Sequence, residues 1–512
     1  MKIALSCDPL TRRGPLFPER AEHYNTDTTL MNIPTAVVAP TDTPYDYDLI
    51  VVGSGPAGEK AAIQAAKLHK HVAVIEQSPA LGGSCIHTAT LPSKTLREAV
   101  LFVLGLEQRS FNGIQASIKK HQLGVQDLLR YKTAVVQHQA EAVRRKLDRN
   151  DIDILYGHAM FLDPHRLMIE SSDGTRRACT AEVIVLAVGS RPARPQTIPF
   201  DNQHVFDTDS ILYLDRIPRS LVVIGAGVVG CEYASIFATL GVKVTLIDAR
   251  PDILEFLDHE LQQMLLYRMR TTGVILRLGE EVVAVEVPEA GRVEAHCVSG
   301  KVVTAERVLY AAGRVGNTEG LGLEAIGLET DQRGLLCVNE HFQTTIPHIY
   351  AVGDVIGFPA LAATAMHQGR LASAHAFLRT NGAADAQIPP TPLAPLPYGI
   401  YSIPEVSMVG ATEETLTQER VPYEIGHAFY RETARAHIMG DTEGMLKLVF
   451  HRETLQLLGV HIIGERAAEL IHLGQAVIAY GGTIEYFIDN VVNYPTLSEA
   501  YKVAALNGYN RL

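Results

Sequence analysis

The sequence predicts an α/β protein in which two domains are each built around a parallel β-sheet. Two observations support this fold class. A short apolar run leads into a glycine-rich turn at Gly53 and then into a helical segment, and the same arrangement begins again at Gly225. Each helical segment is followed by a second apolar run, as in a strand–helix–strand unit. The chain has 512 residues, which suggests three to four domains at ~150 residues each and leaves room for both units.

The composition is that of a globular protein, with 47% hydrophobic and 20% charged residues. Lys and Arg number 45 against 57 Asp and Glu, and the formal net charge is −12. This charge argues against a nucleic acid or an anionic membrane as partner, because both present phosphate surfaces. No stretch approaches the ~18 consecutive apolar residues that a membrane span needs. We therefore expect neither a nucleic-acid partner nor a membrane association.

The cysteines and the N-terminal segment point to a cytoplasmic protein. The six cysteines lie far apart, and no two have the spacing of metal ligands or of a disulfide framework. We therefore predict reduced thiols and no metal site. Residues 1–44 contain no apolar run of the signal-peptide type and are expected to form a poorly ordered N-terminal extension, with Met31 as an alternative start.

The turn at Gly53 has the spacing of a dinucleotide fingerprint. Gly53 permits a tight turn, Gly55 lets the backbone approach a pyrophosphate at the helix N-terminus, and Gly58 allows helix and strand to pack closely. The second strand of the unit ends at Glu76, whose carboxylate can accept a ribose hydroxyl. Strand, turn, helix, strand and acid therefore follow in the order that a Rossmann-like domain requires.

Gly225, Gly227 and Gly230 repeat this spacing, and the strand that follows them ends at Asp248. Two fingerprints in one chain predict two Rossmann-like dinucleotide-binding domains. Two dinucleotides held by one chain suggest electron transfer between them, with one a permanent carrier and the other exchangeable.

Between the fingerprints lies the segment 82–94, Gly-Gly-Ser-Cys-Ile-His-Thr-Ala-Thr-Leu-Pro-Ser-Lys. It resembles the active-site region of the flavoprotein disulfide reductases, the family of glutathione reductase and dihydrolipoamide dehydrogenase. Further motifs of that family follow in order along the chain: 183–192 with Gly189, 308–314 with Gly313, 349–354 ending at Asp354, 401–405 and 464–469. The resemblance runs from about Tyr45 to Leu512 and depends on several ordered motifs.

The resemblance implies three domains after the N-terminal extension. Residues 45–190 and 311–385 would form an FAD-binding domain, 191–310 an NAD(P)-binding domain, and 386–512 an α+β dimerisation domain. It also implies a tightly bound FAD in each subunit, whose ribityl chain Asp354 would bind, and a homodimer or higher homo-oligomer. NAD(H) and NADP(H) would be the exchangeable substrates.

Two positions depart from the family pattern. The family's redox disulfide needs a second cysteine after Cys85, and here that position is Thr90. The family's acid–base histidine near the C-terminus is replaced by Tyr494, a phenol of reference pKa ~10 and a poor proton shuttle at neutral pH. Electrons therefore have no route from the flavin to a disulfide substrate. Within the family, this pattern most resembles the soluble pyridine nucleotide transhydrogenases.

That resemblance implies an FAD-dependent enzyme that exchanges hydride between NADPH and NAD⁺. The exchange would follow a ping-pong mechanism through the flavin and would use no redox disulfide. Lys94 and Glu232 would form a buried ion pair beside the flavin and the nicotinamide, and are the two predicted catalytic residues. Asp248 would accept the ribose 2′-OH of NAD(H), and Arg250 would contact the 2′-phosphate of NADP(H). The complete set of predicted cofactor-binding residues is Gly53, Gly55, Gly58, Glu76, Gly83, Gly189, Gly313, Asp354, Gly225, Gly227, Gly230, Asp248 and Arg250.

Other interpretations of the sequence stay open. An exposed reduced flavin can pass electrons to quinones or dyes, which would make the protein an NAD(P)H diaphorase or quinone reductase of the same fold. A nucleotide-binding redox sensor is a less favoured alternative, because no added interaction segment is present apart from the N-terminal extension. The sequence assigns no chemical role to Cys85 or His87, and it does not decide between NAD and NADP.

Overall fold

The structure is a computed structural model, and it describes residues 44–108, 125–289, 291–378 and 395–512. The N-terminal extension expected over residues 1–44 therefore lies, except for its last residue, outside the described residues. The domain boundary expected between residues 385 and 386 lies outside them as well. Among the described residues, no helix is long and apolar enough to cross a bilayer.

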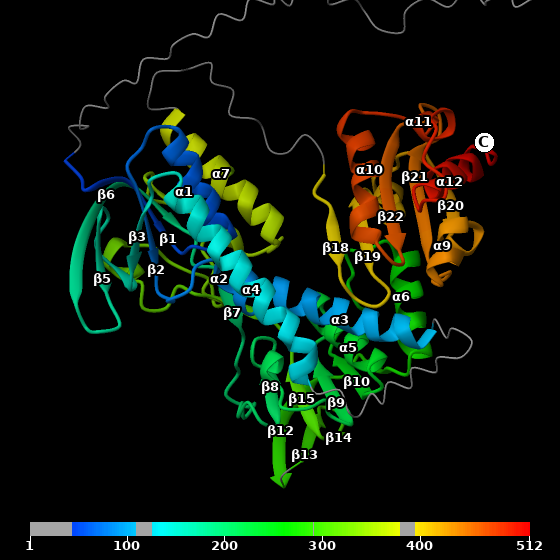
Figure 1. The fold of residues 1–512 in the computed structure, drawn as a ribbon, viewed down its shortest axis with the longest axis horizontal. Helices are drawn as coiled ribbons and strands as arrows, with labels where there is room; N and C mark the ends of the chain where they lie inside the picture. The colour runs from blue at the N-terminus through cyan, green and yellow to red at the C-terminus, as the bar shows by residue number, and fades with distance from the viewer. Residues whose placement is uncertain (1–43, 109–124, 290, 379–394) are drawn as a thin grey trace, which may run out of the picture. The chain divides into compact units, whose positions relative to one another are not determined.

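The first sheet contains the first fingerprint, with strand order β3-β2-β1-β6-β5-β4 and β17 paired to β6 (Figure 1). The pairs β1–β2, β2–β3, β1–β6 and β6–β17 are parallel, whereas β4, β5 and β6 form an antiparallel meander. The strands are β1 (Tyr47–Val52), β2 (Val72–Glu76), β3 (Asp153–Tyr156), β4 (His158–Asp163), β5 (Arg166–Glu170), β6 (Arg176–Leu186) and β17 (Ile349–Ala351).

Helices α1 and α7 lie side by side against this sheet (Figure 1). A side chain at Gly369 of α7 would come 2.1 Å from the carbonyl oxygen of Ala57 in α1, so only a glycine allows this close approach. Helix α1 begins at Pro56, directly after the glycine turn, because proline has no N–H to lose and its φ suits the first turn of a helix. The helices of this part of the chain are α1 (Pro56–Lys67), α2 (Gly83–His87), α3 (Thr90–Gln108), α4 (Val125–Asp148) and α7 (Ala362–Leu378).

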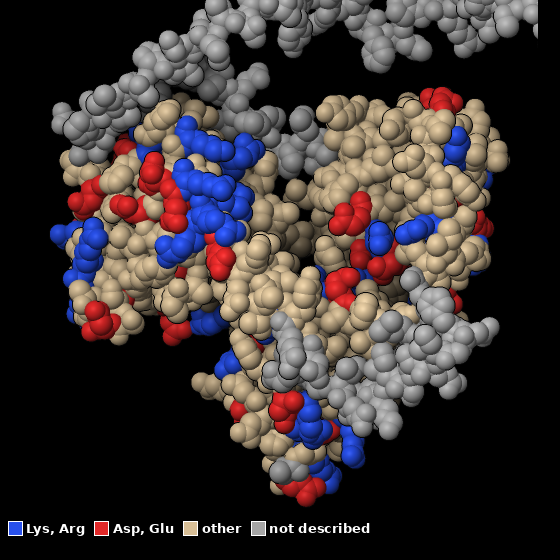
Figure 2. All heavy atoms as spheres, in the orientation of Figure 1, with Lys and Arg blue, Asp and Glu red and all other residues tan. Residues whose placement is uncertain are grey.

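Basic side chains gather over the C-terminal half of α4 in the view of Figure 2, although the chain as a whole is acidic. The last turn of α4 carries Arg145 and Lys146. Cations are favoured there because the carbonyl end of a helix carries a partial negative charge.

The second sheet is fully parallel, with strand order β11-β10-β9-β15-β8, and it contains the second fingerprint. Residues 221–224 are at most 6% exposed, which agrees with the continuous apolar run of a strand buried on both faces. A smaller antiparallel sheet, β12-β13-β14, follows β11. The elements are β8 (Val205–Asp207), β9 (Ser220–Ile224), α5 (Val228–Thr239), β10 (Lys243–Asp248), α6 (His259–Thr271), β11 (Ile275–Leu278), β12 (Val282–Glu289), β13 (Arg292–Cys297), β14 (Val302–Ala305) and β15 (Arg307–Tyr310).

The chain crosses between the first two sheets in one short antiparallel pair, β7 (Ser190–Pro192) with β16 (Arg314–Gly316). The third sheet is antiparallel, with strand order β18-β19-β22-β21-β20. Its elements are β18 (Tyr398–Ile400), β19 (Val406–Gly410), α8 (Glu413–Glu419), β20 (Tyr423–Phe429), α9 (Ala434–Met439), β21 (Met445–His451), β22 (Leu457–Ile463), α10 (Ala467–Ala479), α11 (Glu485–Asp489) and α12 (Glu499–Tyr509).

The predicted fold class is confirmed, with two parallel dinucleotide-type sheets and a C-terminal α+β part. Strands β2 and β10 end at Glu76 and Asp248, the two acids expected at these positions. A side chain at Gly58 would lie 1.9 Å from the carbonyl oxygen of Gly53, so the helix can approach the turn only with a glycine there. The second fingerprint has the same geometry, because a side chain at Gly230 would lie 1.8 Å from a backbone oxygen of its own turn.

Candidate functional site

A cavity of about 980 Å³ opens at the turn of the first fingerprint. This volume is at the upper end of the ~300–1,000 Å³ typical of ligand pockets. Its walls come from the first sheet, from α2, α3 and the first turns of α5, from the 3-10 turn η4 (Gly353–Ile356), and from the third sheet with α10. The predicted site residues that line it are Gly53, Gly55, Glu76, Gly83, Lys94, Gly189, Glu232 and Asp354.

The remaining predicted site residues are absent from the lining of this cavity: Gly58, Gly313, Gly225, Gly227, Gly230, Asp248 and Arg250. Gly58 lies beneath the first turn, against Gly53. Helix α5, which follows the second glycine turn, brings Val229 and Glu232 to the cavity wall. The second fingerprint therefore reaches the cavity through its helix, whereas its glycine turn and Asp248 lie elsewhere.

The carboxylate of Glu76 is held by the turn that precedes it. Its Oε2 accepts hydrogen bonds from the backbone N–H and the hydroxyl of Ser54, at 3.0 and 2.6 Å, and its Oε1 accepts one from the N–H of Ser78 at 2.8 Å. The hydroxyl of Ser54 also accepts the N–H of Gly82 at 2.9 Å, so it connects the glycine turn to the start of α2. Ser54 was not predicted, although its place between Gly53 and Gly55 was a signal in the sequence.

Lys94 and Glu232 meet across the boundary between α3 and α5. Lys94 Nζ lies 2.7 Å from Glu232 Oε2, and the two side chains are 24% and 3% exposed. The other carboxylate oxygen of Glu232 accepts the backbone N–H of Tyr401 at 2.9 Å. The contact expected between Lys94 and Glu232 is therefore present, while their part in catalysis stays a prediction.

Asp354 is connected to the crossing between the two parallel sheets. The hydroxyl of Ser190 donates to Asp354 Oδ2 at 2.9 Å, and Arg314 donates to the hydroxyl and the carbonyl oxygen of Ser190, both at 2.8 Å. Because the Ser190 hydroxyl accepts from Arg314, its single proton is directed to Asp354. Sequence reasoning missed Ser190 and Arg314, which directly follow the predicted Gly189 and Gly313.

The structure places Cys85 and Thr90 together at the cavity. Burial raises the pKa of the Cys85 thiol, and this outweighs the hydrogen bond from Thr90 and the charge of Lys94, which lower it. His87 Nε2 donates to the carbonyl oxygen of Leu81 at 2.8 Å, so this ring nitrogen is satisfied by the backbone.

Tyr494, the residue in place of the family's histidine, is 72% exposed and does not line the cavity. The described lining therefore contains neither a dithiol nor this proton-transfer residue.

Asp248 and Arg250 form a local ion pair. Arg250 donates to Asp248 through Nε at 3.0 Å, through Nη2 at 2.8 Å and through its backbone N–H at 2.9 Å, and Ala226 N–H donates to the same carboxylate at 2.5 Å. Burial acts to raise the pKa of Asp248, but these hydrogen bonds together hold it below its usual range. The sequence placed Arg250 as a counter-charge for a phosphate, and the structure shows it already paired with the acid.

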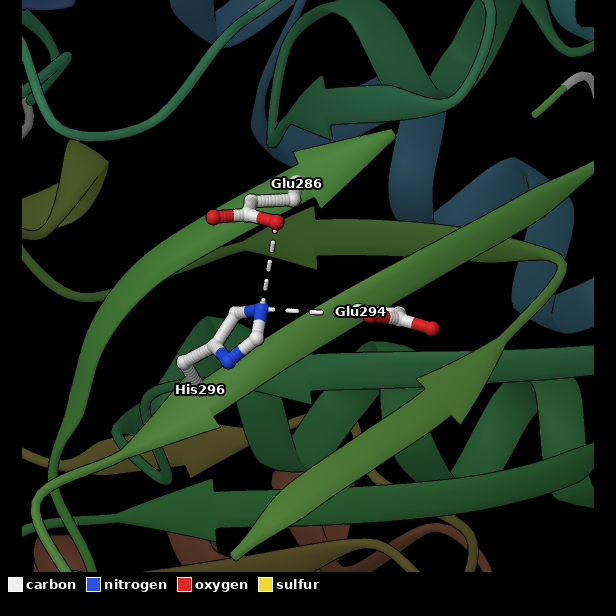
Figure 3. A group of neighbouring side chains, drawn as sticks. All are labelled: Glu286, Glu294 and His296. Atoms are coloured by element: carbon white, nitrogen blue, oxygen red, sulfur yellow. Dashed lines mark ion pairs between the residues drawn. The ribbon is translucent and has the colours of Figure 1, made fainter. Parts of the chain in front are cut away.

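Two groups of possible metal ligands occur among the described residues, and neither lines the cavity. In the first, on β12 and β13, His296 Nε2 lies 3.6 Å from Glu286 and 4.0 Å from Glu294 (Figure 3). The second group consists of Asp258, Glu260 and Glu413, and the ammonium group of Lys447 lies among them, 2.9 Å from Asp258 and 3.1 Å from Glu260. A lysine cation thus occupies the position between these carboxylates.

Two family models match the chain. One, described as pyridine nucleotide-disulphide oxidoreductase, matches residues 47–369, and the other, described as the dimerisation domain of that family, matches residues 396–505. The soluble pyridine nucleotide transhydrogenase of Mycobacterium bovis is 50% identical over 471 residues, which cover 91% of this chain and 98% of that protein. The protein of the same name from Klebsiella pneumoniae is 47% identical over 471 residues, which cover 91% and 99%.

Solved structures show the same fold. LpdA from Mycobacterium tuberculosis superimposes with a TM-score of 0.81 at 26% identity, over 90% of this chain and 99% of that one. The HOCl-induced flavoprotein disulfide reductase RclA from Escherichia coli superimposes with a TM-score of 0.78 at 25% identity, with the same coverage. The family resemblance seen in the sequence motifs is confirmed: the chain belongs to the pyridine nucleotide-disulphide oxidoreductases and, within them, to the soluble pyridine nucleotide transhydrogenase family.

Proposed function

We propose that this protein exchanges hydride between NADPH and NAD⁺ with a bound flavin as carrier. The observation that carries the proposal is the combination at the cavity wall: the ion pair Lys94–Glu232 is present, whereas Thr90 stands beside Cys85 where a second thiol would be needed. The relatives at 47–50% identity have the name of this activity. In the described lining of the cavity no second thiol accompanies Cys85, while the chain has the glycine turns and acids of both fingerprints.

Membership of the family implies a flavin and a pyridine nucleotide, and we propose that the flavin is FAD. The residues present fit such a group, because the backbones of Gly55 and Gly83 face each other, and a side chain on Gly83 would come 3.0 Å from Gly55 Cα. The two glycines leave this part of the cavity wall free of side chains, so a pyrophosphate could approach the backbone at the start of α1. Glu76 would be near the ribose, and Asp354 would bind the ribityl chain. When bound, the flavin supplies reversible two-electron chemistry that accepts and returns a hydride.

The chain's own residues then have limited tasks. Exchange of hydride between two nicotinamides moves no net proton, so a protonated Cys85 and an exposed Tyr494 are no obstacle. Lys94 and Glu232 reach the cavity from two separate helices and form an ion pair at its wall. This pair would hold one positive and one negative charge in place where the nicotinamide must dock. The walls contributed by α5 and by the third sheet would exclude water from the reacting groups.

The second fingerprint would bind the exchangeable nucleotide. The space beside Gly227 in its turn is open, since a side chain there would meet nothing within 4 Å. The approach of a pyrophosphate to the backbone requires such an open space. We propose that the carboxylate of Asp248 accepts a hydrogen bond from the 2′-OH of NAD(H). Arg250, which donates to this carboxylate, would bind the 2′-phosphate of NADP(H). We further propose that the protein is a cytoplasmic homodimer or higher homo-oligomer, which the match to a dimerisation domain supports.

The test is an anaerobic assay of the purified full-length protein with NADPH and thionicotinamide adenine dinucleotide, whose reduced form is detected separately. We expect the preparation to contain about one FAD per chain and to transfer hydride in both directions. A folded protein without releasable flavin would refute the proposal. Reduction of a quinone by NADPH, without transfer to the thionicotinamide analogue, would instead identify a diaphorase.

A further inference from the structure

The segment 401–405 joins strands β18 and β19 of the third sheet, and its first residue lines the cavity. The backbone N–H of Tyr401 donates to Glu232 Oε1 at 2.9 Å, while Oε2 of the same carboxylate lies 2.7 Å from Lys94 Nζ. Glu232 is buried, so both of its oxygens need partners within the protein. One of the two partners therefore comes from the C-terminal part of the chain.

The ring of Tyr401 carries a second interaction. Lys94 Nζ lies 5.0 Å from the centroid of this ring, within the range of a cation–π contact. Among the described residues, the hydroxyl of Tyr401 makes no hydrogen bond, and burial raises its pKa. The ring, rather than the hydroxyl, therefore supports the lysine.

The segment is anchored to the same two helices that carry the ion pair. Ile403 N–H donates to the hydroxyl of Ser235 in α5, at 3.0 Å, one turn after Glu232. Arg97, one turn after Lys94 in α3, donates to the carbonyl oxygen of Ser402 at 3.1 Å.

Arg97 also fixes the end of the segment. Its side chain is 2% exposed, and Nη2 lies 3.1 Å from Glu405 Oε2. A cation buried this deeply is stable only with close charged or polar partners, so the segment and the two helices are held in one geometry.

We propose that Tyr401 is a positioning residue for the ion pair Lys94–Glu232, so that the C-terminal part of the chain contributes to the site of its own subunit. The backbone N–H of Tyr401 fixes the carboxylate, and its ring restricts the ammonium group to the side of the carboxylate that faces the cavity. The inference rests on the proposed function, because the pair must act on the bound nucleotide.

The first experiment compares Tyr401→Leu and Tyr401→Phe in anaerobic stopped-flow reduction of the holoenzyme flavin by NADPH. Loss of the cation–π contact should slow the limiting rate by about 2- to 30-fold, with little change in the apparent affinity for NADPH. Tyr401→Phe keeps the ring and should restore most of the rate. Tyr267→Leu, at a tyrosine of α6 that is 62% exposed, is the matched control and should leave the rate unchanged.

A double-mutant cycle separates positioning from general loss of packing. In a Lys94→Met background, Tyr401→Leu should have almost no further effect, because the cation that the ring supports is gone. An undiminished effect in that background, or a Tyr401→Leu rate equal to wild type, would overturn the inference.

A readout independent of the flavin is amide hydrogen exchange of the peptide that contains Tyr401, followed by mass spectrometry. Glu232→Ala should accelerate its exchange, because the acceptor of the Tyr401 N–H is removed, and unchanged protection would contradict the backbone part of the inference. If wild-type protein reduces its flavin but does not pass hydride to the thionicotinamide analogue, the proposed function fails. In that case the flavin-reduction rates of the Tyr401 variants and the hydrogen exchange of Glu232→Ala would still test whether Tyr401 positions the ion pair.

Discussion

Nucleotide selectivity should depend on the pair formed by Asp248 and Arg250. The carboxylate of Asp248 is 8% exposed and the guanidinium of Arg250 is 48% exposed, and two side-chain hydrogen bonds join them at 2.8 and 3.0 Å. An NADP(H) phosphate brings close to two negative charges toward Asp248, and Arg250 is the cation beside it. We therefore predict that Arg250→Ala damages the reaction of NADPH selectively, whereas Asp248→Asn favours it.

The magnitude follows from the exposure of the two groups. A hydrogen bond to a charged group contributes ~1.5–3 kcal/mol, and the solvent exposure of Arg250 places its contribution at the lower end. Arg250→Ala should therefore lower kcat/KM for NADPH by about tenfold, or ~1.4 kcal/mol. Like charges ~4 Å apart repel by ~4 kcal/mol at an effective dielectric of ~20, but Arg250 already neutralises much of this repulsion. Asp248→Asn should thus improve NADPH by about tenfold at most, and it should weaken NADH by about tenfold because a charged acceptor is lost.

The assay is the steady-state kcat/KM for NADPH and for NADH, each with the thionicotinamide acceptor, at low and at high salt. We expect the wild-type protein to accept both nucleotides, with NADP(H) bound more weakly and more sensitively to salt. Equal losses with NADH and NADPH in Arg250→Ala would show that Arg250 does not contact the 2′-phosphate. A wild-type enzyme inactive with NADPH would refute the reasoning for Asp248 as well.

Three further predictions concern charge and burial. Glu232→Gln keeps the shape of the carboxylate but removes the charge paired with its lysine partner, so hydride exchange should fall about tenfold or more, and an unchanged rate would contradict its role. Burial raises the pKa of Cys85, so iodoacetamide should label it more slowly than the exposed Cys337 at pH 8. The variant Cys85→Ser should retain most of the hydride-exchange activity. A loss of activity above about a hundredfold, or ~2.7 kcal/mol, would show that the thiol has a chemical role. The hydrogen bond from His427 lowers the pKa of Glu260 to about 2, so the stability from this group is present above its unfolded pKa of ~4.3 and is lost as the pH falls toward 2. The difference in urea midpoint between wild type and Glu260→Gln should therefore shrink between pH 5 and pH 2, and a constant difference would rule out this linkage.

Much of the fold could be predicted because its signals are local. The two glycine turns show in the sequence, since the backbone geometry there excludes any side chain at Gly58 and Gly230. The acids Glu76 and Asp248 could be placed at strand ends by their spacing from those turns. The ion pair of Asp248 with Arg250 is also local, but it was not predicted, because spacing alone does not tell whether a flexible arginine folds back on its neighbour.

The site itself was predicted only in part. Lys94 and Glu232 were placed together by resemblance to a family, and no property of the sequence between them indicates that residues 138 positions apart should meet. Ser190, Arg314 and Tyr401 were absent from the predicted site, although each lay in or beside a motif that was recognised. Nothing in their immediate sequence indicates which distant group each of them contacts.

The sequence by itself determined the two dinucleotide-type units, the position of each glycine turn and the presence of Thr90 where a redox disulfide would need a second cysteine. Each depends on residue identity and short spacing, which act through the local backbone. The tertiary structure decided which side chains share the cavity: Tyr401 meets Glu232 across 169 residues, and Ser190 meets Asp354 across 164. Such contacts arise only when helices and sheets from distant parts of the chain pack together, because a hydrogen bond needs its two atoms within about 3 Å.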